Sequence, residues 1–317
     1  MRGFILDNNG AREVAFAEAD AARGQAKLVW LHFDGRNEQA LAWLDSQEGI
    51  PSLVRAALIA VETRPRVEIL GTGALVNLRG LGATPEDDPD ELASIRIWAE
   101  AGWVVSVTKR SVMALDQVAA RFVNGCIHDP GDFVTAVADT ITDALDPDVA
   151  ALGDYVDNCE RELTGPDAYR IRRQVSRTRN RAIGYRRFVA PQRQALERLA
   201  GAPLDWLDND DRAHLRDAAD RAARMVEELE TVRERSALIH DELTDLRAER
   251  LDSRSLTISI VAMIFLPLTF ITGLLGMNVE GIPYADRSWA FWGVTGLCVA
   301  IALGVAAYFI HRQWLGK

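Results

Sequence analysis

The longest apolar runs of the chain lie near its C-terminal end. Residues 256–275 and 288–310 form runs of 20 and 23 residues without a charged side chain. Because a helix rises about 1.5 Å per residue, each run can cross a hydrocarbon core of about 30 Å. The twelve residues 276–287 connect them. The pattern predicts a transmembrane hairpin with a short loop on the far side of the membrane.

A heptad pattern precedes the first run. The segment 204–266 contains no proline and 202–272 contains no glycine. Apolar residues recur there in alternating steps of three and four once Ser236 is included: Leu215, Ala218, Ala222, Met225, Leu229, Val232, Ile239, Leu243 and Leu246. This seam predicts one helix from about residue 210 to about residue 275, which needs neighbours along its length, and we expect self-association to supply them. The alternative is a break near Asp252-Ser253.

The part before residue 150 alternates between strand and helix patterns. Strand-like runs cover 27–33, 67–70, 74–78, 94–98 and 103–108, and helix-like runs cover 38–45, 52–61, 112–124 and 133–145. We therefore expect an α/β domain with a mixed sheet over 1–150. Helix patterns alone follow at 154–163 and 168–199, so 151–254 should be a helical region that includes the start of the long helix, capped by Asp208 or Asp210. The transmembrane domain is then 255–317.

Positive charge orients the predicted hairpin. The loop between the runs holds a single basic residue, Arg287. The first run is preceded by Arg247, Arg250 and Arg254, and the second is followed by His311, Arg312 and Lys317. Since cytoplasmic flanks carry the excess of Lys and Arg, we expect both termini in the cytoplasm and a multi-pass protein of the cell inner (plasma) membrane. The N-terminal segment lacks the apolar stretch of a secretory signal peptide.

The net charge of −10 belongs almost entirely to the part before the apolar runs. Such acidity is compatible with cations and argues against nucleic acid as a partner, although solubility alone explains it equally well. The three cysteines, Cys126, Cys159 and Cys298, are scattered and predict neither a disulfide framework nor a zinc finger. The sequence has no Walker loop, nucleophile elbow or dinucleotide turn, so we do not expect an enzyme.

One tripeptide, Gly276-Met277-Asn278, lies between the two apolar runs. An α/β domain, a long helix that enters the first span, this signature and a second span together resemble the CorA superfamily of divalent-cation transporters. Further segments resemble its ZntB branch: 276–283 (GMNVEGIP), 265–273 (FLPLTFITG), 62–66, 94–98 and 190–193. Glu280 departs from that branch, which commonly has glycine there.

The resemblance implies a CorA-like homopentamer in which five copies of the long helix surround a pore and the second spans form an outer ring. It implies transport of divalent cations, Zn²⁺ foremost, with Cd²⁺, Ni²⁺, Co²⁺ or Mg²⁺ as candidates and protons as a candidate coupling ion, and no cofactor. The alternatives are a CorA-type channel for Mg²⁺ or Co²⁺ and a membrane-anchored metal sensor that does not transport.

The resemblance places Asn278 at the pore entrance. Five amide oxygens could hydrogen-bond the water shell of a dication without removing it, which suits ions that lose water reluctantly. The alternative is that Asn278 only caps the helix in a left-handed conformation. We expect Gly276 to permit close approach of helices or a turn, and Met277 to pack rather than to bind metal.

A face of the first span carries the predicted pore lining. Ser255, Ile258, Ala262, Leu266 and Thr269 follow one another in steps of three or four. Ile258 and Leu266 could form apolar constrictions, and Thr269 either offers its hydroxyl to the pore or bonds its own backbone near Pro267. Neither span holds Asp, Glu, His, Lys or Arg, and the predicted pore lining offers no imidazole or thiolate ligand, so a largely hydrated ion is the better hypothesis.

Acidic residues lie at both ends of the predicted pore. Glu280 and Asp286 in the loop could concentrate cations, or Asp286 could pair with Arg287. Asp252 could line the inner mouth, or cap a helix and pair with Arg254.

Two further patterns carry little weight. Residues 126–129 (CIHD) hold too few ligands for a zinc site. The ten arginines within 161–193 resemble a nucleic-acid patch, but the family resemblance implies a cytoplasmic helix that faces acidic surfaces of its neighbours.

Overall fold

The computed structural model describes residues 1–61, 64–83, 92–163, 168–278, 282, 284 and 286–315, with the side chains of 168–170 and 312–315 excepted. The chain forms two compact units, Met1–His240 and Asp241–Lys317. Each is described by itself.

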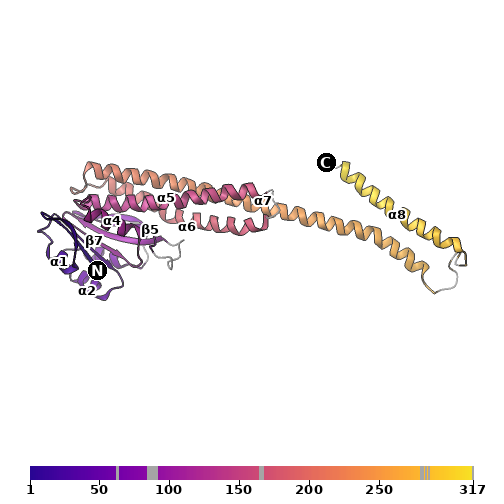
Figure 1. Cartoon of the computed structure of the whole chain (residues 1–317), viewed down its shortest axis with the longest axis horizontal. Coiled ribbons are helices and arrows are strands. Elements are labelled where there is room, and N and C mark those ends of the chain that lie inside the picture. Colours follow the sequence, from indigo (N-terminus) through magenta and orange to yellow (C-terminus); the bar gives the residue numbers. More distant parts are fainter. Residues whose placement is uncertain are drawn as a thin grey trace. The chain divides into compact units, whose positions relative to one another are not determined.

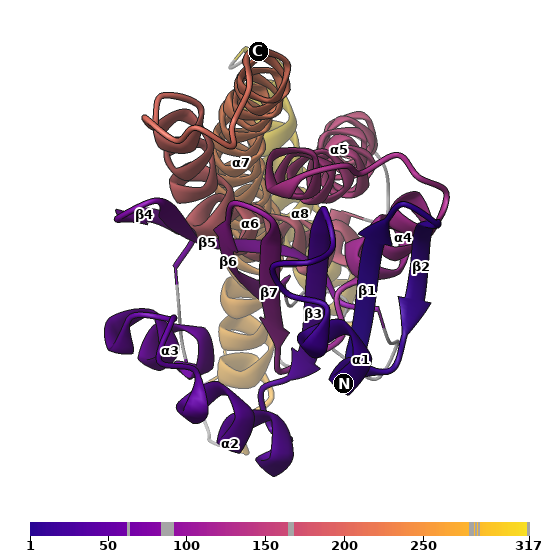
Figure 2. The ribbon, with the colours of Figure 1, turned by 90° about the vertical axis from the view of Figure 1, so that its left-hand side faces the viewer.

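The first unit contains a mixed sheet (Figure 2). Its described strands are β1 (Arg2–Asp7), β2 (Gly10–Val14), β3 (Leu28–Asp34), β4 (Arg66–Leu70), β5 (Gly73–Leu81), β6 (Leu92–Glu100) and β7 (Trp103–Thr108), in the order β2-β1-β3-β7-β6-β5-β4. The β3–β7 pair is parallel and the other pairs are antiparallel. All five expected strands are confirmed, whereas β1 and β2 were not predicted.

Helices cover both faces of this sheet, which explains why its strands are apolar on both sides. On one face, Val29, Leu31 and Phe33 of β3 pack with buried residues of α2 (Glu38–Ser46) and α3 (Ser52–Ile59). On the other face, the centroid of the Trp30 ring lies 6.0 Å from that of Phe122 in α4 (Met113–Val123). It lies 4.8 Å from the centroid of Phe133 in α5 (Pro130–Glu162). A short helix, α1 (Phe16–Ala21), was not predicted.

Three long helices complete the first unit, and the last of them continues beyond it. They are α5 (Pro130–Glu162), α6 (Ala168–Ala200) and α7 (Asn209–Leu275). Helix α5 joins the two separately expected helices 133–145 and 154–163, with Pro147 inside it. The Asp208 Oδ1 atom accepts the backbone N–H groups of Asp210 and Asp211 at 2.8 Å each, so the expected cap of α7 is confirmed.

The heptad seam of α7 is buried within a single chain. From Leu215 to Ile239 its residues, Ser236 included, are at most 2 % exposed. Within residues 1–240, α5 and α6 lie alongside α7 (Figure 1). Ion pairs tie α7 to both of them, at 2.8 Å between Arg221 and Asp139 and at 2.5 Å between Arg186 and Glu230. The expectation that self-association covers the seam was therefore wrong, because α5 and α6 supply the neighbours that a long helix needs.

The second unit contains the end of α7 and α8 (Ser288–Leu315). Helix α7 runs through Asp252 and Ser253 without the alternative break, and it includes Pro267. Both helices are long and apolar enough to cross a membrane, and 0 % of each apolar window is buried inside the chain. An apolar surface this exposed in one chain requires lipid or further copies of the protein to cover it.

The burial of the seam predicts the effect of truncating Leu229, which is 0 % exposed. Leu229→Ala should destabilise the helices of the first unit by about 2–5 kcal/mol, because it removes buried methyl groups and leaves a cavity. The matched change Leu238→Ala, on the same helix but 68 % exposed, should alter stability by about 0.5 kcal/mol or less. Denaturant unfolding of the full chain in detergent, followed by circular dichroism, measures both.

An unchanged unfolding midpoint together with dissociation of the Leu229→Ala assembly would contradict this assignment. It would show that the seam joins separate chains.

Candidate functional site

The signature tripeptide begins where α7 ends. The Gly276 backbone N–H donates to the Thr272 carbonyl oxygen at 2.9 Å. A Cβ atom at position 276 would lie only 2.9 Å from that same oxygen. Glycine therefore allows the last turn of α7 to close tightly before the chain leaves the helix.

Asn278 and Met277 are both exposed, and Met277 retains 49 % of its accessible surface. Among the described residues Tyr284, with φ of 61°, is the one non-glycine residue in the left-handed region. The alternative that Asn278 caps α7 in a left-handed conformation is therefore wrong. The side chain of Asn278, which carries the amide, is exposed.

The residues of the predicted lining share one exposed side of α7. Ile258 is 70 % and Leu266 is 72 % exposed, and Ser255, Ala262 and Thr269 are exposed as well. The half-buried residues of the same run are Ile260, Ile264, Pro267, Leu268 and Ile271. At about 100° per residue these two sets lie on opposite sides of the helix. The predicted lining is thus the more exposed of these two sides, in a run of which no side is covered within one chain.

The hydroxyl group of Thr269 bonds its own helix. Its Oγ1 donates to the Phe265 carbonyl oxygen at 2.7 Å, which is the second of the two interpretations of this residue. Thr272 does the same, donating to the Leu268 oxygen at 2.9 Å. A donating hydroxyl keeps its acceptor lone pairs, so Thr269 can still accept a hydrogen bond from water.

Two acidic residues near the ends of the apolar part of α7 and of the loop, Asp252 and Asp286, form no described ion pair with the arginines next to them in the sequence. Asp252 is exposed inside α7, so it caps no helix, and no ion pair to Arg254 occurs among the described residues. Asp286 is exposed too, and its expected alternative partner Arg287 forms no described ion pair with it. Glu280 lies outside the described residues.

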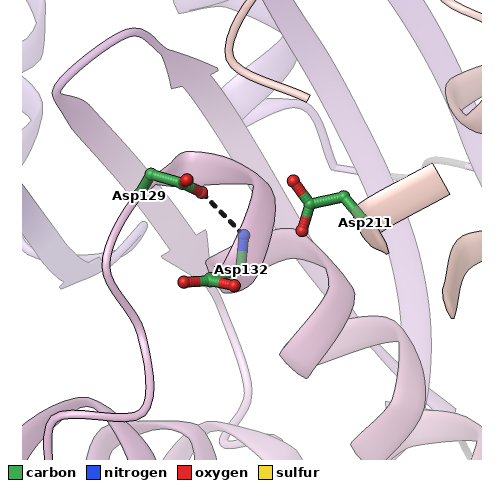
Figure 3. A group of neighbouring side chains, drawn as sticks. All are labelled: Asp129, Asp132 and Asp211. Carbon is green, nitrogen blue, oxygen red and sulfur yellow. Dashed lines mark hydrogen bonds between the residues drawn. The ribbon is translucent and has the colours of Figure 1, made fainter. Parts of the chain in front are cut away.

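The structure brings together a second group of potential ligands in the first unit, shown in Figure 3. Ligand oxygens of Asp129, Asp132 and Asp211 all lie within 4.8 Å of one another. The first two stand at the start of α5 and the third stands at the start of α7. A Cβ atom at Gly131 would collide with the Asp211 carboxylate, so glycine permits this approach of the two helix ends.

These carboxylates accept hydrogen bonds from the backbone at both helix ends. Asp129 accepts the N–H of Asp132 at 2.9 Å, Asp132 accepts the N–H of His128 at 2.7 Å, and Asp211 accepts the N–H of Asp208 at 3.1 Å. Capping explains each of these groups without a metal ion. Sequence reasoning considered 126–129 but missed the cluster, because 79 positions separate Asp132 from Asp211 and no local pattern joins them.

Electrostatics distinguishes Asp211 within this cluster. Its side chain is 4 % exposed, and burial raises its pKa to about 6. The hydrogen bond from Asp208 opposes this rise, and the carboxylates of Asp129, Asp208 and Asp132 add to it. Burial also raises the pKa of Asp129. The cluster therefore favours one bound proton at mildly acidic pH.

Comparison with known proteins decides the family. A family model described as "CorA-like Mg2+ transporter protein" matches residues 25–312. The chain belongs to this CorA-like family. The resemblance drawn from the signature and the two apolar runs is confirmed.

Relatives and solved structures of CorA-like proteins span nearly the whole chain. The zinc transport protein ZntB of Yersinia enterocolitica is 33 % identical over 98 % of this chain and 95 % of that protein, and ZntB of Klebsiella pneumoniae is 34 % identical over 98 % and 95 %. The structure of full-length CmaX is 30 % identical, with a TM-score of 0.81 over 99 % of this chain and 98 % of that one. The CorA magnesium transporter of Methanocaldococcus jannaschii is 18 % identical with a TM-score of 0.80 over 97 % and 96 %, so it supports the fold alone.

Membership of the CorA-like family sets the class of function. It is a family of transporters, which confirms the expectation that the chain is not an enzyme. A divalent cation is accordingly the transported substrate rather than a cofactor. The fold, an α/β unit with a long helix that continues into an apolar helical hairpin, is the fold of this family.

The raised pKa of Asp211 predicts a pH-dependent stability. Because the carboxyl holds its proton more tightly in the folded protein than in the unfolded chain, its stabilising contribution is complete below about pH 4 and is lost as the pH rises through about 6. Asp211→Asn keeps an acceptor for the Asp208 N–H. It should raise the thermal unfolding temperature at about pH 8 and leave it nearly unchanged at about pH 4. The corresponding gain in the free energy of unfolding between the two pH values is at most about 3 kcal/mol.

Asp220→Asn, an exposed change on the same helix, is the control and should show no such pH dependence. Equal behaviour of the two variants at both pH values would contradict the assignment.

Proposed function

We propose that this protein is a homopentameric transporter of divalent cations, Zn²⁺ foremost, that passes a largely hydrated ion through a pore lined by α7. One observation carries the proposal. An exposed, charge-free side of α7 leads directly to Gly276-Met277-Asn278, where the helix ends. The names of the ZntB relatives support zinc as the substrate, and the family description supports Mg²⁺ as the second candidate.

A pore requires several copies of α7. Ile258 and Leu266 keep 70 % and 72 % of their surface in one chain, and a single helix encloses no conduit. Cyclic symmetry places the same side of every copy toward one axis. The half-buried side with Ile260 and Ile264 then faces away from the axis, toward other apolar helices or lipid. In this arrangement residues 255–317 form the membrane domain.

The amide of Asn278 is the group best suited to select the ion. Five carbonyl oxygens around an axis accept hydrogen bonds from the outer surface of a hydrated dication. Complete dehydration would need strong ligands, and the described residues from Ser255 to Asn278 include no Asp, Glu, His or Cys. Gly276 supports this role, because its tight turn fixes the point at which Asn278 leaves the helix.

The residues below the signature suit a gate rather than a binding site. Rings of Leu266 and Ile258 would form apolar constrictions that stop conduction by losing their water. Thr269, lying between Leu266 and the entrance, keeps acceptor lone pairs for the water that accompanies the ion. Opening then requires only that the constrictions widen enough to hold water.

Acidic residues at both mouths would raise the local cation concentration. Asp252 and Asp286 are exposed and form no described ion pair, and Glu280 adds a further carboxylate to the loop sequence. The basic flanks of the hairpin favour the inner membrane, with both termini in the cytoplasm and this loop outside. In that orientation a negative-inside potential drives influx, at about 2.3 kcal/mol per charge per 100 mV.

The role of Asn278 can be tested by zinc uptake into proteoliposomes under an imposed negative-inside potential. Asn278→Ala should slow uptake by roughly tenfold or more, about 1.4 kcal/mol of barrier, because it removes every amide from the entrance. The control Asn124→Ala, an exposed asparagine at the end of α4, should leave uptake unchanged.

Uptake by Asn278→Ala at the wild-type rate would reject the pore assignment. Absence of uptake by the wild-type protein, for both Zn²⁺ and Mg²⁺, would favour a membrane-anchored sensor instead.

A further inference from the structure

The first unit contains a groove between α5 and α6 that transport does not explain. Its volume is about 610 Å³, and its described lining comprises Tyr155, Gln174, Arg177, Thr178, Asn180, Arg181 and Gly184. Pockets for small molecules typically measure about 300–1,000 Å³. Tyr155 belongs to α5, and the other lining residues share one face of α6.

The lining is suited to an anion. It offers two guanidinium groups, two amides and two hydroxyl groups, and none of the described lining residues is acidic. The surrounding helix reinforces this charge, because residues 168–196 include nine arginines and no Asp or Glu in a chain whose net charge is −10. The described lining and the helix that supplies most of it are therefore basic, although the protein as a whole is negative.

One of the two guanidinium groups is held in place by its neighbours. Arg181 Nη2 lies 3.3 Å from the Tyr185 hydroxyl oxygen and 3.9 Å from the Asp148 carboxylate. Tyr185 is 1 % exposed and donates its hydroxyl hydrogen to Asp148 Oδ2 at 2.9 Å. Arg177, one turn away on α6, is exposed and forms no ion pair among the described residues. One guanidinium that contacts neighbouring side chains and one that is exposed thus line the same groove.

Gly184 supplies an independent indication of a ligand. A glycine in the interior of a helix costs about 1 kcal/mol relative to alanine. Gly184 does not have a positive φ, and a Cβ atom added there would meet nothing within 4 Å. Neither backbone conformation nor close packing in the chain therefore accounts for this glycine. What it does provide is open space on the floor of the groove.

We propose that this groove binds a phosphate-bearing anion. Guanidinium groups match phosphate oxygens in paired hydrogen bonds, and the amides of Gln174 and Asn180 add further donors. Tyr155, 51 % exposed at the rim, offers a ring face to an organic part of the ligand. The phosphate could belong to a soluble phosphorylated metabolite or to a lipid headgroup, and this distinction is left to the experiment.

The test uses the full-length protein in phosphatidylcholine nanodiscs, titrated calorimetrically with Mg²⁺-free ATP and with inorganic phosphate. A second arm measures capture of the detergent-solubilised protein on phosphatidylglycerol vesicles. Arg177→Gln should weaken binding by about tenfold or more, because it removes a charge-assisted contact. The matched control Arg179→Gln removes the same charge from the opposite side of α6, about 200° around the helix, and should change binding less than about twofold.

A second pair of variants tests the open floor of the groove. Gly184→Leu should abolish binding by filling it, and Gly184→Ala should preserve binding and stabilise α6. Dependence on Arg177 and Gly184 in the ATP or phosphate arm identifies a soluble ligand, and the same dependence in the vesicle arm alone identifies a lipid headgroup.

Equal losses for Arg177→Gln and Arg179→Gln would show adsorption by charge alone and overturn the proposal. So would the absence of binding in both arms, or unchanged binding by Gly184→Leu.

Discussion

The continuity of α7 is the constraint on which the rest of the structure depends. One helix has a buried seam from Leu215 to Ile239, continues without a break through Asp252-Ser253, and ends at Leu275, directly before the signature. The two parts of this helix have different surroundings. The first buries its apolar positions against α5 and α6, and the second keeps its apolar positions exposed.

The composition of the exposed part limits what can cross the membrane. The segment from Ser255 to Asn278 offers no carboxylate, imidazole or thiolate, the ligands that hold a dehydrated Zn²⁺. Its amide, hydroxyl and backbone oxygens are weaker ligands, which favours an ion that keeps most of its water. The strongly charged groups lie outside the described apolar runs, where they can attract cations without holding them tightly.

The sequence predicted most elements of this fold because their patterns are local. Strand β7 and the long helix were recovered almost to the residue, since branched apolar residues mark the strand and the absence of glycine and proline marks the helix. Strands β1 and β2 were missed because a short apolar core between charged residues, FIL, and a polar edge strand carry little periodicity. The partners of the heptad seam were also assigned wrongly, because periodicity shows that a face is buried but not which helix buries it. The Asp129–Asp211 approach depends on tertiary contact alone, and the placement of the pore residues around an axis depends on copies that no sequence pattern displays.

The most direct test of the pore compares the accessibility of two positions that are two residues apart and lie on opposite sides of α7. In a protein whose native cysteines are replaced by serine, Leu266→Cys and Ile264→Cys are exposed to a membrane-impermeant thiol reagent during zinc uptake. A pore lined by the Leu266 side predicts that the reagent modifies the cysteine at 266 and blocks uptake, while the cysteine at 264 remains unmodified and uptake continues. Modification at 264 with block, or protection of both positions in a protein that transports zinc, would contradict it.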